Sequence, residues 1–190
     1  MLAMSELGGN ARYQFYRTER WLGRLEAIYE GKHTFVGNSD DPLDHILAFF
    51  LNCYHIKDWL QNGPEWQDNV PKSIKHKAVE QFVNESTALC ICADLCNGYK
   101  HFERDKTPRS GSMPGLHRTN FSVDDDGTKS FGYIFKTGRG NIDARQLAEE
   151  CFEAWRKFIH ESTPESLEEL AKRNREYRVR KSCLSPVANR

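Results

Sequence analysis

The sequence predicts a mainly α-helical protein: a helical bundle with a β-hairpin inserted at about residues 116–137. Apolar residues recur at helical spacing in most stretches of the chain. Before the last long helical stretch the spacing changes to alternation, which is typical of strands. Hydrophobic residues make up 38% of the 190 residues and aromatic residues 12%, which suffices for a globular core.

Two helices are expected in the first third of the chain. The first runs from 11 to 29, where apolar residues recur at helical spacing, and Gly31 ends it. The second begins at Asp41, which suits a cap position, and Pro42 suits the first helical turn. The Asn-Gly-Pro sequence at 62–64 ends this second helix.

The middle of the chain changes from helix to hairpin. A helical region covers 73–102, and polar residues at 84–87 indicate that it is one kinked helix or two helices. The Pro- and Gly-containing segment 105–115 is expected to be a loop. Two β-rich stretches, LHRTNFSV and KSFGYIFKT, flank the turn sequence DDDGT and predict the hairpin, which GRGNI closes.

One long helix and one short helix are expected after the hairpin. The long helix begins near Asp143 and ends before Thr163. A short polar helix follows at 164–178, and we expect the tail from residue 181 to be disordered. The predicted organisation is a flexible N-terminus at 1–10, one bundle domain with the hairpin at 11–162, and a polar C-terminal helix and tail at 163–190.

Charge and cysteine content limit the class of protein. Lys and Arg number 27 and Asp and Glu also 27, so the formal net charge is zero. This balance argues against a strongly cationic nucleic-acid binder, although a local basic patch would suffice. The six cysteines match no disulfide scaffold or zinc motif, and we interpret them as small buried hydrophobic residues in a reducing compartment. They are Cys53, Cys90, Cys92, Cys96, Cys151 and Cys183. With no signal peptide and no long apolar run, we expect a cytoplasmic protein.

A group of polar residues occupies the helical stretch CICADLCNGYKH. Asp94, Asn97 and His101 fall within about 60° of one another on a helix, so they share one line. The second helix carries His55 and Asp58 on its surface. If the two helices pack antiparallel, these side chains meet the first group in one polar pocket.

Three interpretations of this polar group remain open. It is a satisfied structural network of hydrogen bonds, a catalytic or ligand site, or a metal site formed by His55, Asp58, Asp94 and His101. No Glu-x-x-His pair supports the metal site, so we expect no metal and no cofactor. Gly98 costs a helix about 1 kcal/mol relative to Ala, which indicates a close approach by another group.

The segment CNGYKH resembles the motif of HEPN domains (higher eukaryote and prokaryote nucleotide-binding), which are small helical bundles. The motif is short; Asn97 and His101 match its second polar position and its His, but Cys96 stands where the family has Arg. The resemblance covers 11–102 and 143–160, and the hairpin lies outside it. It implies an RNA- or nucleotide-binding protein, for example a metal-independent ribonuclease of a toxin–antitoxin or antiphage system with a partner protein.

In the enzyme that the resemblance implies, His101 is the general acid/base, Asn97 orients the phosphate, and Lys100 offsets its charge in place of the missing Arg. A degenerate member without activity would instead be a dimerisation or protein-interaction module. The family commonly forms homodimers. The sequence adds a candidate interface on the last long helix, where Phe152, Trp155 and Ile159 form one apolar stripe; the alternative is that the hairpin covers this stripe.

Overall fold

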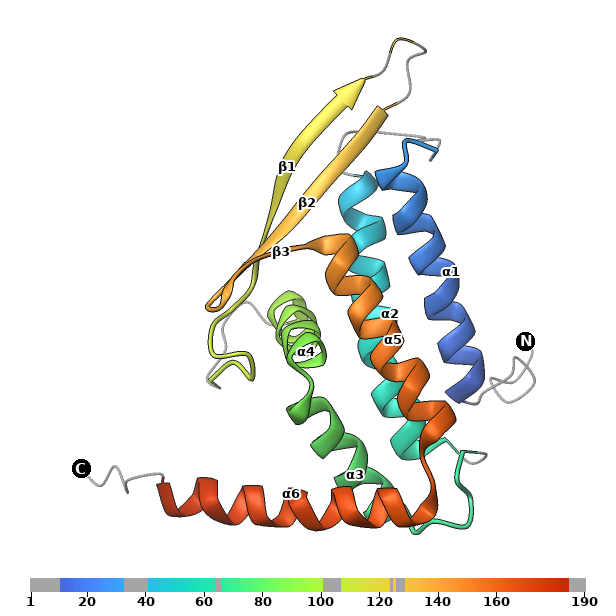
Figure 1. Ribbon diagram of the computed structural model, residues 1–190, viewed down its shortest axis with the longest axis vertical. Coiled ribbons are helices and arrows are strands. Elements are labelled where there is room, and N and C mark those ends of the chain that lie inside the picture. The colour runs from blue at the N-terminus through green and yellow to red at the C-terminus, as the bar shows by residue number, and fades with distance from the viewer. Residues whose placement is uncertain are drawn as a thin grey trace.

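The computed structural model describes residues 11–32, 41–63, 66–100, 107–123, 125 and 129–184. Helices α1, α2 and α5 run side by side, the sheet lies across one end of them, and α6 crosses the other end (Figure 1). The predicted fold class, mainly α with a β-hairpin insertion, is therefore confirmed. The helices are α1 (Ala11–Tyr29), α2 (Asp41–Asn62), α3 (Lys72–Glu85), α4 (Thr87–Lys100), α5 (Ala144–Glu161) and α6 (Pro164–Leu184).

The helical region after residue 72 forms two helices, α3 and α4. Ser86 separates them with an extended backbone at φ −94° and ψ 116°. Its main-chain N–H still bonds to the carbonyl of Phe82, and its hydroxyl accepts a hydrogen bond from the N–H of Leu89 at 3.3 Å. Ser86 thus closes one helix and caps the next, because a serine side chain competes well for free main-chain donors.

The inserted hairpin is part of a three-stranded antiparallel sheet. Strands β1 (Gly115–Val123) and β2 (Lys129–Thr137) confirm the predicted hairpin, and β3 (Gly140–Asp143) extends it. The sequence analysis took this last stretch only as the close of the hairpin. Gly140 begins β3 with φ at 118°, a conformation that glycine adopts without strain.

A short connection joins the sheet to α5. Asp143 ends β3 and caps α5, since its carboxylate accepts hydrogen bonds from the main-chain N–H groups of Arg145 and Gln146. The hydroxyl of Tyr29, on α1, lies 3.0 Å from the carbonyl of Tyr133 on β2 and 3.2 Å from the Asp143 carboxylate. One tyrosine therefore ties α1 to the sheet and to the start of α5.

The apolar stripe of α5 packs against other helices of the chain, with Trp155 buried and Phe152 and Ile159 half-buried. Trp155 is fully buried, and its ring lies 5.6 Å from that of Phe82 on α3. Phe152 stacks on Phe15 of α1 at 4.6 Å. The expectation of an uncovered stripe available to a second copy is therefore wrong for Trp155. Rings from α1 and α3 supply this cover, whereas the sequence analysis offered the hairpin for that role.

Helix α6 is longer than expected. It continues to Leu184, so the prediction of a tail beginning at residue 181 is wrong for residues 181–184. Its first half packs on α3, where the Asn174 amide donates to the side-chain oxygen of Gln81 at 3.3 Å. Leu167 and Ala171 belong to the common core. Among the described helices, none is both long enough and apolar enough to cross a membrane.

Candidate functional site

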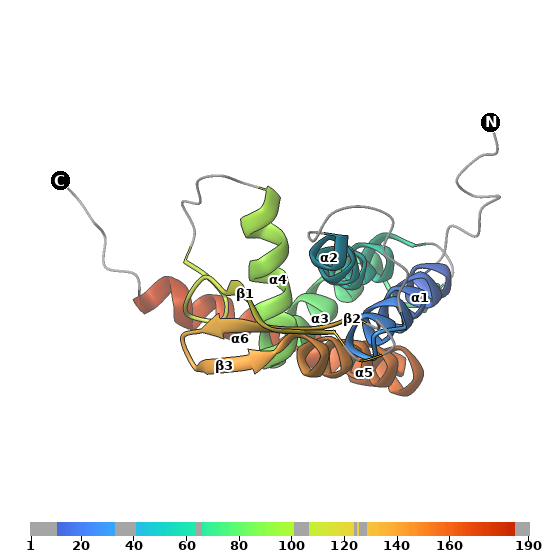
Figure 2. The same ribbon diagram turned by 90° about the horizontal axis from the view of Figure 1, so that it is seen from above.

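The candidate site lies at the C-terminal half of α4. This half carries Asp94, Asn97 and Gly98, and the helix ends at Lys100. In the view from above, this end of α4 projects from the body of the bundle (Figure 2). The C-terminal end of α4 thus lies at an edge of the molecule.

Asp94 is completely buried and is bound by the loop that follows α4. Its Oδ2 atom accepts a hydrogen bond from the main-chain N–H of Ser110 at 2.7 Å and one from the Ser110 hydroxyl at 2.8 Å. A buried carboxylate is costly without such donors. These bonds hold the returning loop against α4, which favours a structural role for Asp94.

Helix α2 packs on a different face of α4 from the one expected. The thiols of Cys92 and Cys96 donate to the main-chain carbonyl of Phe50 on α2, at 3.5 and 3.2 Å. At 100° per residue, Asp94 lies on the opposite side of α4 from these two cysteines. The expectation that α2 packs on the Asp94 face is therefore wrong at this level of the bundle.

Gly98 gives room to the returning loop. A Cβ atom placed at this position would collide with the terminal methyl group of Met113. The expected close approach to Gly98 is thus made by a loop side chain. Because this methyl group is the end of a flexible and 44% exposed side chain, it would move at small cost.

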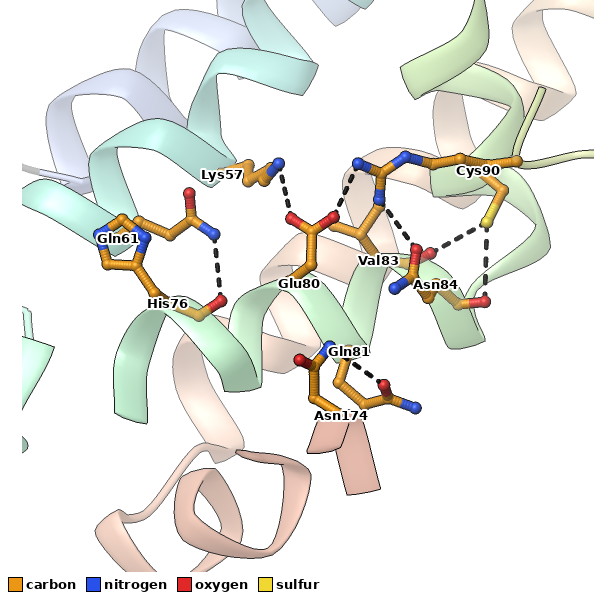
Figure 3. A network of polar contacts seen from close by, with 10 residues as sticks. Lys57, Gln61, His76, Glu80, Gln81, Val83, Asn84, Cys90 and Asn174 are labelled. Carbon is orange, nitrogen blue, oxygen red and sulfur yellow. Dashed lines mark hydrogen bonds and ion pairs between the residues drawn. The ribbon is translucent and has the colours of Figure 1, made fainter. Parts of the chain in front are cut away.

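A network of charged residues also binds the loop that follows α4, through Arg109, the residue before Ser110. The Arg109 guanidinium contacts the Glu80 carboxylate at 2.7 Å and donates to the Asn84 side-chain oxygen at 2.9 Å. The Lys57 ammonium contacts the second oxygen of Glu80 at 2.7 Å (Figure 3). This network joins α2, α3 and the loop, and the sequence analysis did not identify it.

The electrostatics of the network favour the ionised states of Glu80 and Arg109. Burial would raise the pKa of Glu80, but the hydrogen bonds and charges of Lys57 and Arg109 outweigh it, so the pKa is lowered. Burial opposes the charge of Arg109 as well, and the neighbouring Glu80 raises its pKa in spite of this. Two cations share one carboxylate here, and the arrangement is that of a structural ion cluster.

The six predicted site residues differ in how far the structure describes them. His55 and Asn97 are half-buried, and Asp58 is exposed. Lys100 is the last residue of α4, but its side chain is not described, and His101 lies outside the described residues. Their grouping into one polar pocket stays a prediction.

Among the described residues, one group has the composition and spacing of a metal site. The sulfur atoms of Cys53, Cys92 and Cys151 lie within 4.8 Å of one another, and all three residues are buried. They come from α2, α4 and α5, so no short sequence motif could have revealed them. The interpretation of the cysteines as buried residues is confirmed for these three and for Cys90 and Cys96.

Comparisons of the chain with protein-family models, with curated proteins and with solved structures give no significant match.

Proposed function

We propose that the chain is a HEPN-like domain protein that binds RNA or a nucleotide at the C-terminal end of α4 and cleaves RNA there without a metal ion. The observation that supports this proposal is the position of Asn97. It is half-buried in the last turn of α4, at the end that projects from the bundle (Figure 2). A projecting helix end can contact a ligand as large as RNA, which a closed cavity would exclude.

Three residues supply the chemistry in this proposal. His101 takes the proton of the 2′-hydroxyl group or gives one to the leaving oxygen. The Asn97 amide donates a hydrogen bond to a phosphate oxygen, and the Lys100 ammonium offsets the negative charge that develops there. Lys100 is also the last residue of α4, where the helix dipole favours a cation.

Cys96 leaves this site without the arginine of the HEPN motif. It is 1% exposed, and its thiol donates to the carbonyl of Phe50 at 3.2 Å. A guanidinium group at this position would be buried against α2, away from a ligand. The proposed activity therefore depends on Lys100 as the cation next to His101.

A second candidate function, a non-catalytic interaction module, is favoured by a different observation. Asp94 is fully buried and its bonds with Ser110 hold a loop, so at least one member of the polar group has a structural role. In this alternative, the polar group shapes the end of α4 for contact with a partner protein. The resemblance itself supports both candidates, because degenerate family members lack activity.

Purified protein incubated with a panel of labelled RNAs in the presence of a metal chelator tests the two candidates. The ribonuclease proposal predicts cleavage by the wild-type chain and a loss of about 10²–10⁴-fold in His101→Ala. His160→Ala is the matched control, because His160 also lies in the last turn of a helix, α5, and is exposed. Absence of cleavage of every RNA by a folded wild-type chain rejects the ribonuclease.

The resemblance extends the proposal to assembly and biological setting. We propose a homodimer and a toxin–antitoxin or antiphage system in a prokaryote, with a partner protein that restrains the nuclease. Light scattering measures the assembly, since the monomer has a mass of 22.0 kDa and a homodimer has twice that mass. Growth arrest on expression, relieved by a neighbouring gene product and absent in His101→Ala, would support the toxin role.

A further inference from the structure

The thiols at the centre of the bundle point to a function that the proposed RNA site does not involve. Cys53 on α2, Cys92 on α4 and Cys151 on α5 have their sulfur atoms within 4.8 Å of one another. All three side chains are 0% exposed. No disulfide joins these cysteines, so each sulfur atom retains its capacity to bind a ligand.

Cys96 is the fourth member of this thiol cluster, which we define as Cys53, Cys92, Cys96 and Cys151. It lies one turn after Cys92 on the same face of α4, and both thiols reach the same carbonyl, that of Phe50. Three helices that are distant in sequence thus bring three sulfur atoms within 4.8 Å of one another, and Cys96 lies next to Cys92 on the same face of α4.

We propose that the thiol cluster is a binding site for a soft, tetrahedral metal ion of the zinc class, which cross-links α2, α4 and α5. Four cysteines are one of the donor sets that structural zinc sites use. A zinc–sulfur bond of about 2.3 Å places the four sulfur atoms about 3.8 Å apart. Shifts of about 1 Å or less would bring the sulfurs of Cys53, Cys92 and Cys151 to this separation, and the Cys96 side chain, which is not part of the 4.8 Å group, would have to turn toward them.

The binding step is an exchange of protons for the metal ion. Zn²⁺ replaces the four thiol protons, which pass to solvent, and no oxidant or reductant is required. Because thiol protons leave as the ion binds, metal binding is expected to weaken as the pH falls.

The hydrogen bonds that the thiols give up are weak. Cys92 and Cys96 donate to the Phe50 carbonyl, and Cys151 donates to the Ala88 carbonyl at 3.4 Å. A thiol is a poor donor, and carbonyl groups inside helices already accept main-chain N–H groups. Loss of these bonds thus opposes the four metal–sulfur bonds only slightly.

Loading the ion during refolding tests the proposal, because a folded bundle encloses all four sulfur atoms. The chain is unfolded with reductant, refolded with equimolar Zn²⁺ or Co²⁺, and desalted. All samples carry Cys183→Ser, which removes a thiol whose surroundings the structure does not describe. We expect equimolar zinc by elemental analysis and, with Co²⁺, a thiolate-to-cobalt charge-transfer band in the near ultraviolet.

Two alanine variants on the same helix distinguish the cluster from adventitious binding. Cys92→Ala removes the thiol that contacts the other members, so the charge-transfer band and the bound zinc should be lost. Cys90→Ala is the matched control, because Cys90 is equally on α4 and buried, but its thiol faces the carbonyls of Val83 and Asn84 (Figure 3). This control should retain both signals.

The metal stoichiometry of the chain that carries only Cys183→Ser decides the matter even if Cys92→Ala fails to fold. If this chain is folded and holds no zinc, and its cluster thiols all react once it is unfolded, the proposal is overturned. A disulfide, seen as two missing thiols after purification without reductant, overturns it as well. Equal losses of metal in Cys90→Ala and Cys92→Ala would assign the binding to another place on the chain.

Discussion

Ser110 directs both its main-chain N–H and its hydroxyl at one atom, Oδ2 of Asp94, across 16 residues of chain. The carboxylate is completely buried, so these donors replace water that it would otherwise bind. The pair fixes where the chain returns after α4. Any ligand at the end of this helix therefore meets a surface that the pair has shaped.

Ser110→Ala should destabilise the fold by about 1–3 kcal/mol, because it removes one hydrogen-bond donor from the buried Asp94 side chain while the main-chain bond remains. Urea unfolding followed by circular dichroism measures this change. Ser112→Ala is the control two residues away, since its buried hydroxyl has no hydrogen-bond partner among the described atoms. If the two variants lose equal amounts of unfolding free energy, the hydrogen bond between Ser110 and Asp94 does not stabilise the fold.

Glu80→Gln should lower the free energy of unfolding by about 2 kcal/mol at neutral pH, because Lys57 and Arg109 lose their shared anion. The folded-state pKa of Glu80 lies below its ordinary value of 4.5, so the carboxylate stabilises the fold above that pH. This contribution is lost as the pH falls through the folded-state pKa. The difference between wild type and variant should therefore shrink below pH 4.5.

Glu153→Gln is the matched control for the charge network. Glu153 pairs with Arg156 on the surface of α5, where both side chains are more than half exposed. Exposed pairs contribute little, so the variant should unfold like the wild type at every pH. A pH-independent effect of Glu80→Gln would contradict the assigned role of the ionised Glu80.

Tyr29→Phe should lower the free energy of unfolding by about 1–2 kcal/mol. The Tyr29 hydroxyl donates to the Tyr133 carbonyl and accepts a hydrogen bond from the Tyr133 N–H, and the variant loses both bonds. The aromatic ring would stay in place, so the loss of stability measures the contribution of the hydroxyl group alone. Tyr16→Phe is the control, because Tyr16 lies on the same helix and is 54% exposed. It should not change the free energy of unfolding. Hydrogen exchange of the Tyr133 amide should accelerate only in the first variant.

Trp155→Ala should destabilise the monomer by about 3–5 kcal/mol, because a completely buried indole leaves a large cavity. Trp21→Ala should cost less, since Trp21 is only half-buried and lies on the surface of α1 below the Arg24 guanidinium. Thermal unfolding compares the two. If Trp155→Ala instead changes only the mass seen by light scattering, α5 forms an interface and the packing described here is wrong.

Local signals in the sequence predicted most elements of the fold. Helical spacing located α1, α2 and α5, the polar stretch at 84–87 marked the break at Ser86, and alternation with a DDDGT turn located the hairpin. Strand β3 was missed because four residues give too short a pattern. The end of α6 was missed because a polar helix has no apolar stripe to indicate its length.

The sequence by itself determined which segments are helix or strand and which polar residues share a side of α4, because spacing, caps and turns act over a few residues. Only the tertiary structure decided that α2 packs on the cysteine face of α4 and that Asp94 meets Ser110. It also brought Cys53, Cys92 and Cys151 together from three helices. The physical reason is that the orientation of a helix is set by burial of apolar surface against distant segments, and that choice is not encoded in any short stretch of chain.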